Sequence, residues 1–362
     1  MPVFTPHLLS SWFRPLRAGM ALVLLTVPLA GFAQSTVRTD HGSAAAISIQ
    51  LELAHQMQSA GRLQDAETML GTLLEQTRAN LGLFDPAQFA ILEQLANTRT
   101  RQRNWSALLP LLAYYEWLAN RVYGDAPLQL SDQLTRVAGV HEHAAMTTDG
   151  NQRSWHLIQA RMLYWRAISS LQSVAGTEHL LPPLYYAIAL GHYTINRHAS
   201  QRWLTSFETR SDQPALISGW SLPGSERERR SEEIGVELME RIVAYYSRPE
   251  VMPELTAQVM ALRGDWALIH GRSTESTHFY HQALELASIS SCPESLIGIL
   301  FGQTQSLPVP SLVLLPDPCQ SPGELLSEAP SVMQANWADS GLQRPFFTAD
   351  ARNPCIGDNC HE

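Results

Sequence analysis

The sequence predicts an all-α protein built as a helical solenoid, in which pairs of helices repeat along the chain. A dipeptide of a branched apolar residue followed by alanine recurs every 42 residues, and a glycine recurs at the same interval. The dipeptides are Leu53-Ala54, Leu95-Ala96 and Val137-Ala138, and the glycines are Gly82 and Gly124. Between these positions the apolar residues lie three or four apart, as on one face of a helix. Repeats of this length are typical of solenoids, which bury one face of each repeat against the next and seldom catalyse reactions.

The first 33 residues have the composition of a secretory signal peptide. Two arginines, Arg14 and Arg17, precede an apolar run over 18–30, and small residues stand before a cleavage site at Gln34. The run is short for a membrane span, which favours a cleaved signal over a retained anchor. We therefore expect a soluble periplasmic or secreted protein of a Gram-negative bacterium, not membrane-spanning after cleavage, with a polar linker over 34–45.

Charge and composition exclude several classes of function. The formal net charge is −9, and removing the two signal arginines makes it −11, so nucleic acid is not an expected partner. All 25 basic residues are arginine. Without lysine the chain cannot form a phosphate-binding loop of the Gly-Lys-Ser/Thr type, a Ser-x-x-Lys acyl enzyme or a Schiff base.

The helices of the N-terminal repeats, residues 46–199, follow from apolar spacing and turn residues. Gly61 forms the turn inside the first pair, and Asp85-Pro86 opens the second pair, because proline is tolerated in a first helical turn. The third pair is longer, with a loop at Thr147–Asn151. The predicted helices cover Ile47–Met57, Ala66–Leu74, Ile91–Arg101, Trp105–Arg121, Leu134–Ala138, Ala160–Ala167 and Leu184–Asn196.

Regularity fails over 200–230, a polar insert broken by proline and glycine that ends in the charge run Glu226–Arg230. We expect that run to be a solvated loop or the start of a helix. Helical spacing resumes over 231–302, with helices at 231–246, 253–270 and 272–287 and a capping helix at 294–301. The last segment, 303–362, is rich in proline and is expected to be extended or disordered.

Several positions resemble the tetratricopeptide repeat (TPR), which has small residues and an aromatic residue at fixed spacing. In the last repeat these are Gly264, Gly271, Ser276, Tyr280 and Ala283, and in the other repeats they are Ala54, Gly61, Ala66, Leu70, Ala96, Ala160, Tyr164 and Ala167. The 42-residue period resembles the longer-helix variety found in kinesin light chains. The second repeat departs from the pattern, with Arg103 and Leu108 where glycine and alanine are usual. The resemblance implies a right-handed superhelix that binds proteins or peptides in a concave groove, without catalysis.

Within such a groove, five side chains are candidate partner contacts: Arg99, Arg103, Tyr114, His192 and Trp266. The partner is expected to be another protein or a peptide. The predicted function is a scaffold in envelope assembly or transport.

The cysteines leave a second function open. The four cysteines, Cys292, Cys319, Cys355 and Cys360, all follow the repeats. Their even number fits two disulfides, and proximity in the sequence favours Cys355–Cys360 and Cys292–Cys319, with free thiols as the alternative. Cys355 and Cys360 with His361 also resemble a wide c-type haem attachment site, so a small haem or redox protein is the alternative. His141 and His143 are two apart, which does not place two ligands on one helical face, and we expect polar surface histidines there. No metal, cofactor or nucleophile motif is predicted.

Overall fold

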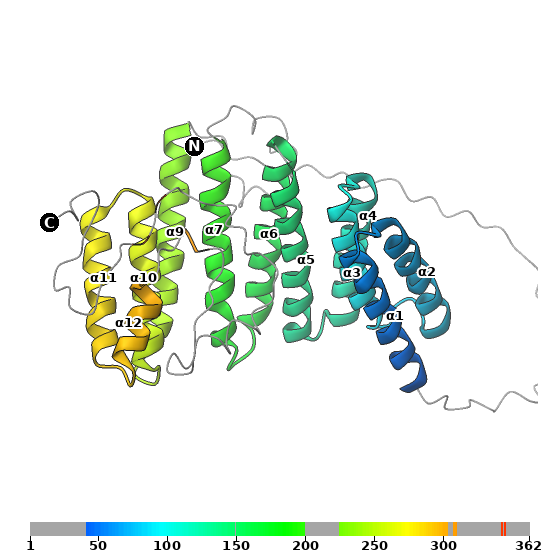
Figure 1. Ribbon diagram of the computed structural model, residues 1–362, viewed down its shortest axis with the longest axis horizontal. Coiled ribbons are helices and arrows are strands. Elements are labelled where there is room, and N and C mark those ends of the chain that lie inside the picture. The colour runs from blue at the N-terminus through cyan, green and yellow to red at the C-terminus, as the bar shows by residue number, and fades with distance from the viewer. Residues whose placement is uncertain are drawn as a thin grey trace, which may run out of the picture. The chain divides into compact units, whose positions relative to one another are not determined.

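The computed structural model describes residues 41–148, 150–199, 224–302, 307–309, 342 and 344 (Figure 1). The chain divides into two units, Met1–Gly42 and Ser43–Glu362. Apart from the first two residues of α1, the described residues belong to the second unit. The described residues form eleven α-helices and one short 3-10 helix, and no strand occurs among them. The prediction of an all-α fold is therefore confirmed.

Helices adjacent in the sequence pack against one another from α2 to α12, and α3 also contacts α5 (Figure 1). The helices of the first half are α1 His41–Ser59, α2 Leu63–Leu81, α3 Gln88–Arg101, α4 Trp105–Tyr123, α5 Pro127–Thr147, α6 Gly150–Leu171, η1 Glu178–Leu180 and α7 Leu181–Ala199. Those of the second half are α9 Gly224–Tyr246, α10 Pro253–Ile269, α11 Ser273–Ser288 and α12 Pro293–Phe301.

Two boundaries differ from the sequence prediction. Helix α9 begins at Gly224, seven residues before the predicted start at 231, so the charge run lies inside the helix. Arg229 and Arg230 each pair with Glu233 one helical turn further on, and such pairs stabilise an exposed helix. The loop predicted at Thr147–Asn151 is shorter, because α5 ends at Thr147 and α6 begins at Gly150.

Three helix pairs, α1–α2, α3–α4 and α10–α11, bury the same set of positions. A small residue lies in the first helix, and a larger one lies in the second helix sixteen positions later. The small residues are Ala54, Ala96 and Gly264, and their larger counterparts are Leu70, Leu112 and Tyr280, all of them buried. The other residues of the TPR-like pattern that belong to helices, Ala66, Ala160, Tyr164, Ala167, Ser276 and Ala283, are buried as well.

The turns inside these pairs share one backbone conformation. Gly61, Arg103 and Gly271 all have positive φ, at 74°, 55° and 72°. The N–H of the following residue donates each time to the carbonyl five residues before it, at 2.9 Å. This arrangement is a Schellman motif, which favours glycine at the positive-φ position because a Cβ is unfavourable there. Arg103 therefore occupies a glycine position, 42 residues after Gly61.

Beyond Gly302, which follows α12, the structure describes five further residues, and some of them contact the helices. Leu307 and Arg344 are buried, and Tyr186 of α7 donates a hydrogen bond to the carbonyl of Val309 at 2.6 Å. Leu307 N–H donates to the carbonyl of Leu342 at 3.1 Å. These tail positions lie in no helix or strand, and they supply packing and polar contacts to the helical body. The rest of the tail, for which extended or disordered structure is expected, lies outside the described residues.

Candidate protein-binding surface

The connection between α2 and α3, together with one face of α4, carries exposed aromatic side chains. Phe84 is 49% exposed and Trp117 is 51% exposed, with ring centroids 5.9 Å apart. Tyr114, one turn before Trp117 on α4, lies 5.7 Å from the Trp117 ring. We refer to Phe84, Tyr114 and Trp117, with the flanking Arg78 and Arg121, as the aromatic surface.

Gly82 directs Phe84 out of the helices. It follows α2 with a φ of 103°, a conformation that is unstrained only for glycine. Its N–H donates to the carbonyl of Arg78 and ends α2. Asp85 then accepts a hydrogen bond from the N–H of Ala87 at 2.8 Å, which closes the turn before α3. Phe84 therefore lies between the end of α2 at Gly82 and the hydrogen-bonded turn at Asp85, which together hold its backbone in place.

The buried side chain of Gln88, the first residue of α3, forms hydrogen bonds to several parts of the aromatic surface and to the loop before α3. Its side chain is fully buried, and its amide nitrogen donates to the carbonyls of Gly82 and Leu83, at 3.2 and 2.9 Å. Its amide oxygen accepts from the Tyr114 hydroxyl at 2.9 Å and from Arg78 Nε at 3.3 Å. One side chain thus fixes the connecting loop, an aromatic ring and a cation, and every hydrogen-bonding group of the amide has a partner.

Two guanidinium groups border the aromatic rings. The Arg78 guanidinium lies 4.5 Å from the Tyr114 ring centre and also pairs with Glu75 at 2.7 Å. The Arg121 guanidinium lies 5.6 Å from the Phe84 ring and pairs with no carboxylate among the described residues. The surface therefore combines apolar area with positive charge on an acidic chain, which suits a partner segment that carries aromatic or aliphatic and acidic side chains.

Two of the five candidate contacts lie at the turn between α3 and α4. Arg99 pairs with Glu67 of α2 at 2.9 Å and donates to the carbonyl of Ala107 at 3.0 Å. It therefore joins three helices and has a structural role. Arg103 is exposed in the turn itself, where its backbone conformation is the notable feature.

The other three candidates lie apart from one another. Tyr114 belongs to the aromatic surface. Trp266 is 1% exposed and packs in the core against Gly235 of α9, where a Cβ would lie 2.4 Å from the indole ring. The structure thus places Trp266 in the interior and not on a groove. His192 of α7 is half-buried, and its Nδ1 lies 3.1 Å from Arg161 Nη1. Burial, with the nearby Arg161 charge, lowers the pKa of His192 well below its usual value.

The expectation that His141 is a surface histidine was wrong. His141 of α5 is buried, and its Nδ1 lies 2.9 Å from Nδ1 of His156 on α6. Such a contact requires one nitrogen to carry a hydrogen and the other to accept it, so the accepting ring is neutral. Burial lowers the pKa of His141 to about 3, with a further contribution from His156, and burial alone lowers the pKa of His156 to about 4. Trp155 packs against both rings.

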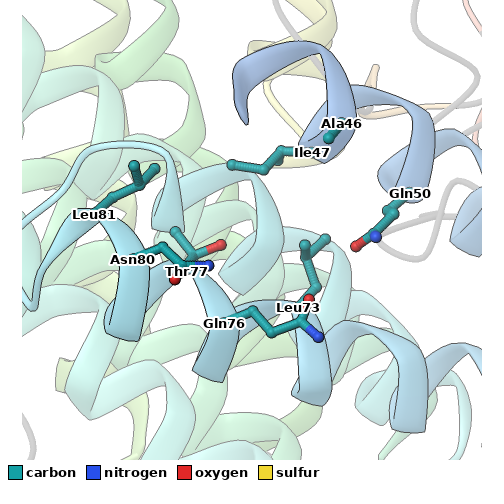
Figure 2. Close-up of a pocket in the computed structure, with 8 residues that line it drawn as sticks. All are labelled: Ala46, Ile47, Gln50, Leu73, Gln76, Thr77, Asn80 and Leu81. Atoms are coloured by element: carbon teal, nitrogen blue, oxygen red, sulfur yellow. The ribbon is translucent and has the colours of Figure 1, made fainter. Parts of the chain in front are cut away.

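A small hollow opens between α1 and α2 (Figure 2). Its volume is about 140 Å³, and it is lined by Ala46, Ile47, Gln50, Leu73, Gln76, Thr77, Asn80 and Leu81. Pockets for drug-sized ligands have volumes of about 300 Å³ or more. We therefore assign no small-molecule site to this hollow.

The remaining predicted chemistry falls largely outside the described residues. Cys319, Cys355, Cys360 and His361 all lie there. Cys292, which precedes α12, is described. The disulfide pairings and the haem site therefore stay predictions. Across the described helices and segments, no three His, Cys, Asp or Glu side chains are grouped so as to hold a metal ion.

No model of a protein family matches the chain, and no curated protein matches it significantly. Among the helices in the described part of the chain, none combines the length and the apolar character needed to cross a membrane.

Proposed function

We propose that this protein is a non-catalytic scaffold of the TPR-like solenoid type, which binds another protein through the aromatic surface. The observation that carries the proposal is that about half of the Phe84 side chain and half of the Trp117 side chain are exposed. The Arg121 guanidinium lies beside Phe84 and forms no ion pair with a carboxylate of the described residues. Exposed aromatic side chains with a neighbouring arginine are the residue types that contribute most to binding energy in protein interfaces. The recurring Schellman turns and the matched small and large core positions support the repeat architecture.

The proposal extends to the compartment. An exported protein of the cell envelope, periplasmic or secreted, accounts for the signal-like segment at the N-terminus and for cysteines that fit disulfides. Assembly or transport in the envelope is the process in which we expect the scaffold to act. Fractionation of the native host, followed by mass spectrometry of the purified protein, tests this. The expected mature chain begins at Gln34 and is found in the periplasm or the medium.

Photocrosslinking in cells tests the aromatic surface directly. A photoreactive phenylalanine derivative at position 117 should give one discrete protein adduct. The same derivative at position 289 is the matched control, since Ile289 is 69% exposed at the far end of the repeats. Adducts of equal yield and identity from both positions would contradict the proposal.

Substitutions then separate binding from folding. The double variant Phe84→Ala, Trp117→Ala should capture the crosslinked partner at least about tenfold less well, because two interface aromatic side chains are lost. Its unfolding free energy should change by no more than about 0.5 kcal/mol per site, since both side chains are exposed. Gln88→Ala should weaken capture too, although it removes no exposed atom, because it frees the loop and Tyr114. Full capture by all variants would refute the assigned surface.

A further inference from the structure

A single arginine from beyond the last helix enters the interior of the C-terminal helices. Arg344 is 5% exposed, and its guanidinium meets both oxygens of Asp265 on α10, with Nε 2.8 Å from Oδ1 and Nη2 in contact with Oδ2. Its remaining nitrogen, Nη1, donates to the carbonyl of Leu300 in the last turn of α12 at 2.9 Å. Three donors of one guanidinium are thus satisfied by two helices.

The acceptors form a site that fits guanidinium better than ammonium. Asp265 is itself 3% exposed, and the Tyr280 hydroxyl of α11 donates to its Oδ1 at 2.9 Å, which fixes the carboxylate. A planar guanidinium can satisfy two carboxylate oxygens and a third acceptor at once, whereas an ammonium on a flexible stem cannot do so in this geometry. The Leu300 carbonyl adds the negative end of a helix to the site.

The cation that pairs with Asp265 does not come from the described helices. Arg263, two residues before Asp265 on α10, is held by Glu275 at 2.7 Å. The positive charge comes instead from a residue 79 positions after Asp265 in the chain. Close to Arg344 in the chain, the Leu342 carbonyl accepts a hydrogen bond from the N–H of Leu307, and the nearby Val309 carbonyl accepts from the Tyr186 hydroxyl of α7. A buried carboxylate without a cation is costly, so the site depends on an arginine supplied from beyond the last helix.

We propose that α10, α11 and α12 form a binding site specific for the arginine side chain of a peptide segment, which the chain's own Arg344 occupies in cis. On this proposal the occupant is exchangeable: when Arg344 is removed, we expect an arginine-bearing segment supplied in trans to take its place. This site is independent of the aromatic surface, since the two share no residue.

The test uses the full chain with Arg344→Ala and a labelled synthetic peptide that spans residues 340–347. The expected result is saturable binding and a rise of several degrees in the melting temperature of the variant. A control peptide in which lysine replaces the arginine should bind at least about tenfold more weakly, because it lacks the planar fork. The double variant Asp265→Asn, Arg344→Ala should bind neither peptide, since the carboxylate that pairs with the guanidinium is gone.

A second variant, Arg344→Lys, keeps the test informative if Arg344→Ala fails to fold. Arg344→Lys retains the positive charge, and the arginine peptide should bind this variant as well, by displacing the substituted side chain from the site. Equal affinity for the arginine and lysine peptides would overturn the proposal, as would the absence of binding to variants with wild-type helicity. Loss of the helical circular-dichroism signal in both variants would also overturn it, because the segment would then be part of the core and not the occupant of a site.

Discussion

At the scale of single residues, the size of one side chain on the first helix of a pair is matched to the size of its neighbour on the second. Gly264 lies against the ring of Tyr280, where a Cβ would be 2.6 Å from two ring carbons. The corresponding residues of the first two pairs are alanines, and their counterparts are leucines. The close approach of α10 and α11 therefore depends on a glycine only because the facing residue is aromatic.

Gly264→Ala should destabilise the protein by about 1–3 kcal/mol, since the added methyl group overpacks the contact with Tyr280. The same substitution in a Tyr280→Leu background should cost less by at least about 1 kcal/mol, because leucine leaves room for it. Urea denaturation of the four proteins of this double-mutant cycle measures the coupling. An equal cost of Gly264→Ala in both backgrounds would show that the clash is not with Tyr280.

At the scale of elements, the turn between α3 and α4 adopts the same Schellman conformation as its counterparts although it has no glycine. Arg103→Gly should stabilise the protein by roughly 0.5–1 kcal/mol, because glycine relieves the strain of a positive φ. The gain is smaller than the strain itself, since glycine also raises the conformational entropy of the unfolded chain. The midpoint of urea unfolding measures the change. Arg103→Ala is the matched control: it removes the same side chain but keeps the Cβ, and should give no gain. A gain of equal size from alanine would mean that the guanidinium, and not the backbone, is unfavourable.

The elements could be predicted from sequence where apolar spacing determines them. The helices that contain Leu53 and Leu95 and the helix over 253–270 follow from that spacing, and Gly61 and Gly271 mark the ends of the first and the last of them. The start of α9 could not be predicted in the same way, since a run of charges is compatible with a loop, and the pairing of Arg229 with Glu233 appears only once the helix exists. Arg103 was recognised as a departure from the pattern, and the structure explains it as a strained residue in an unchanged turn.

The candidate site was less predictable, for physical reasons that differ from residue to residue. Tyr114 was identified from its helix, but the exposure of Phe84 and Trp117 depends on how the loop lies against α4. For Gln88 the sequence did contain a signal, because Gln88 continues the helical spacing of the apolar residues Ile91, Leu92 and Leu95 in the N-terminal direction. A polar residue at such a position is expected to be buried, and Gln88 is fully buried in the structure. The contact between Arg344 and Asp265 joins distant residues without any shared pattern, so no single-sequence argument could find it.

At the scale of the whole molecule, several buried or half-buried histidines have lowered pKa values that keep them neutral at pH 7. The pKa values of His141, His156 and His270 are lowered to about 3, 4 and 4, and those of His143 and His192 are lowered too, in each case chiefly by burial. Glu142 acts in the opposite sense, because burial raises its pKa to about 7. The five histidines thus make the folded state more stable at higher pH, and Glu142 makes it more stable at lower pH.

The sign of the pH dependence follows from proton binding in each state. Between about pH 4 and 6.5 the unfolded histidines are protonated whereas the folded ones are not, so stability falls as the pH falls through this range. We expect the unfolding free energy to be at least about 2 kcal/mol lower at pH 5 than at pH 7.5, after partial compensation by Glu142. Urea unfolding at a series of pH values measures it. His141→Gln should reduce the slope, whereas His55→Ala, at an exposed position of α1, should leave it unchanged. Stability that is constant from pH 7.5 to 5 would show that these histidines accept protons in the folded state, and would contradict their burial as neutral side chains.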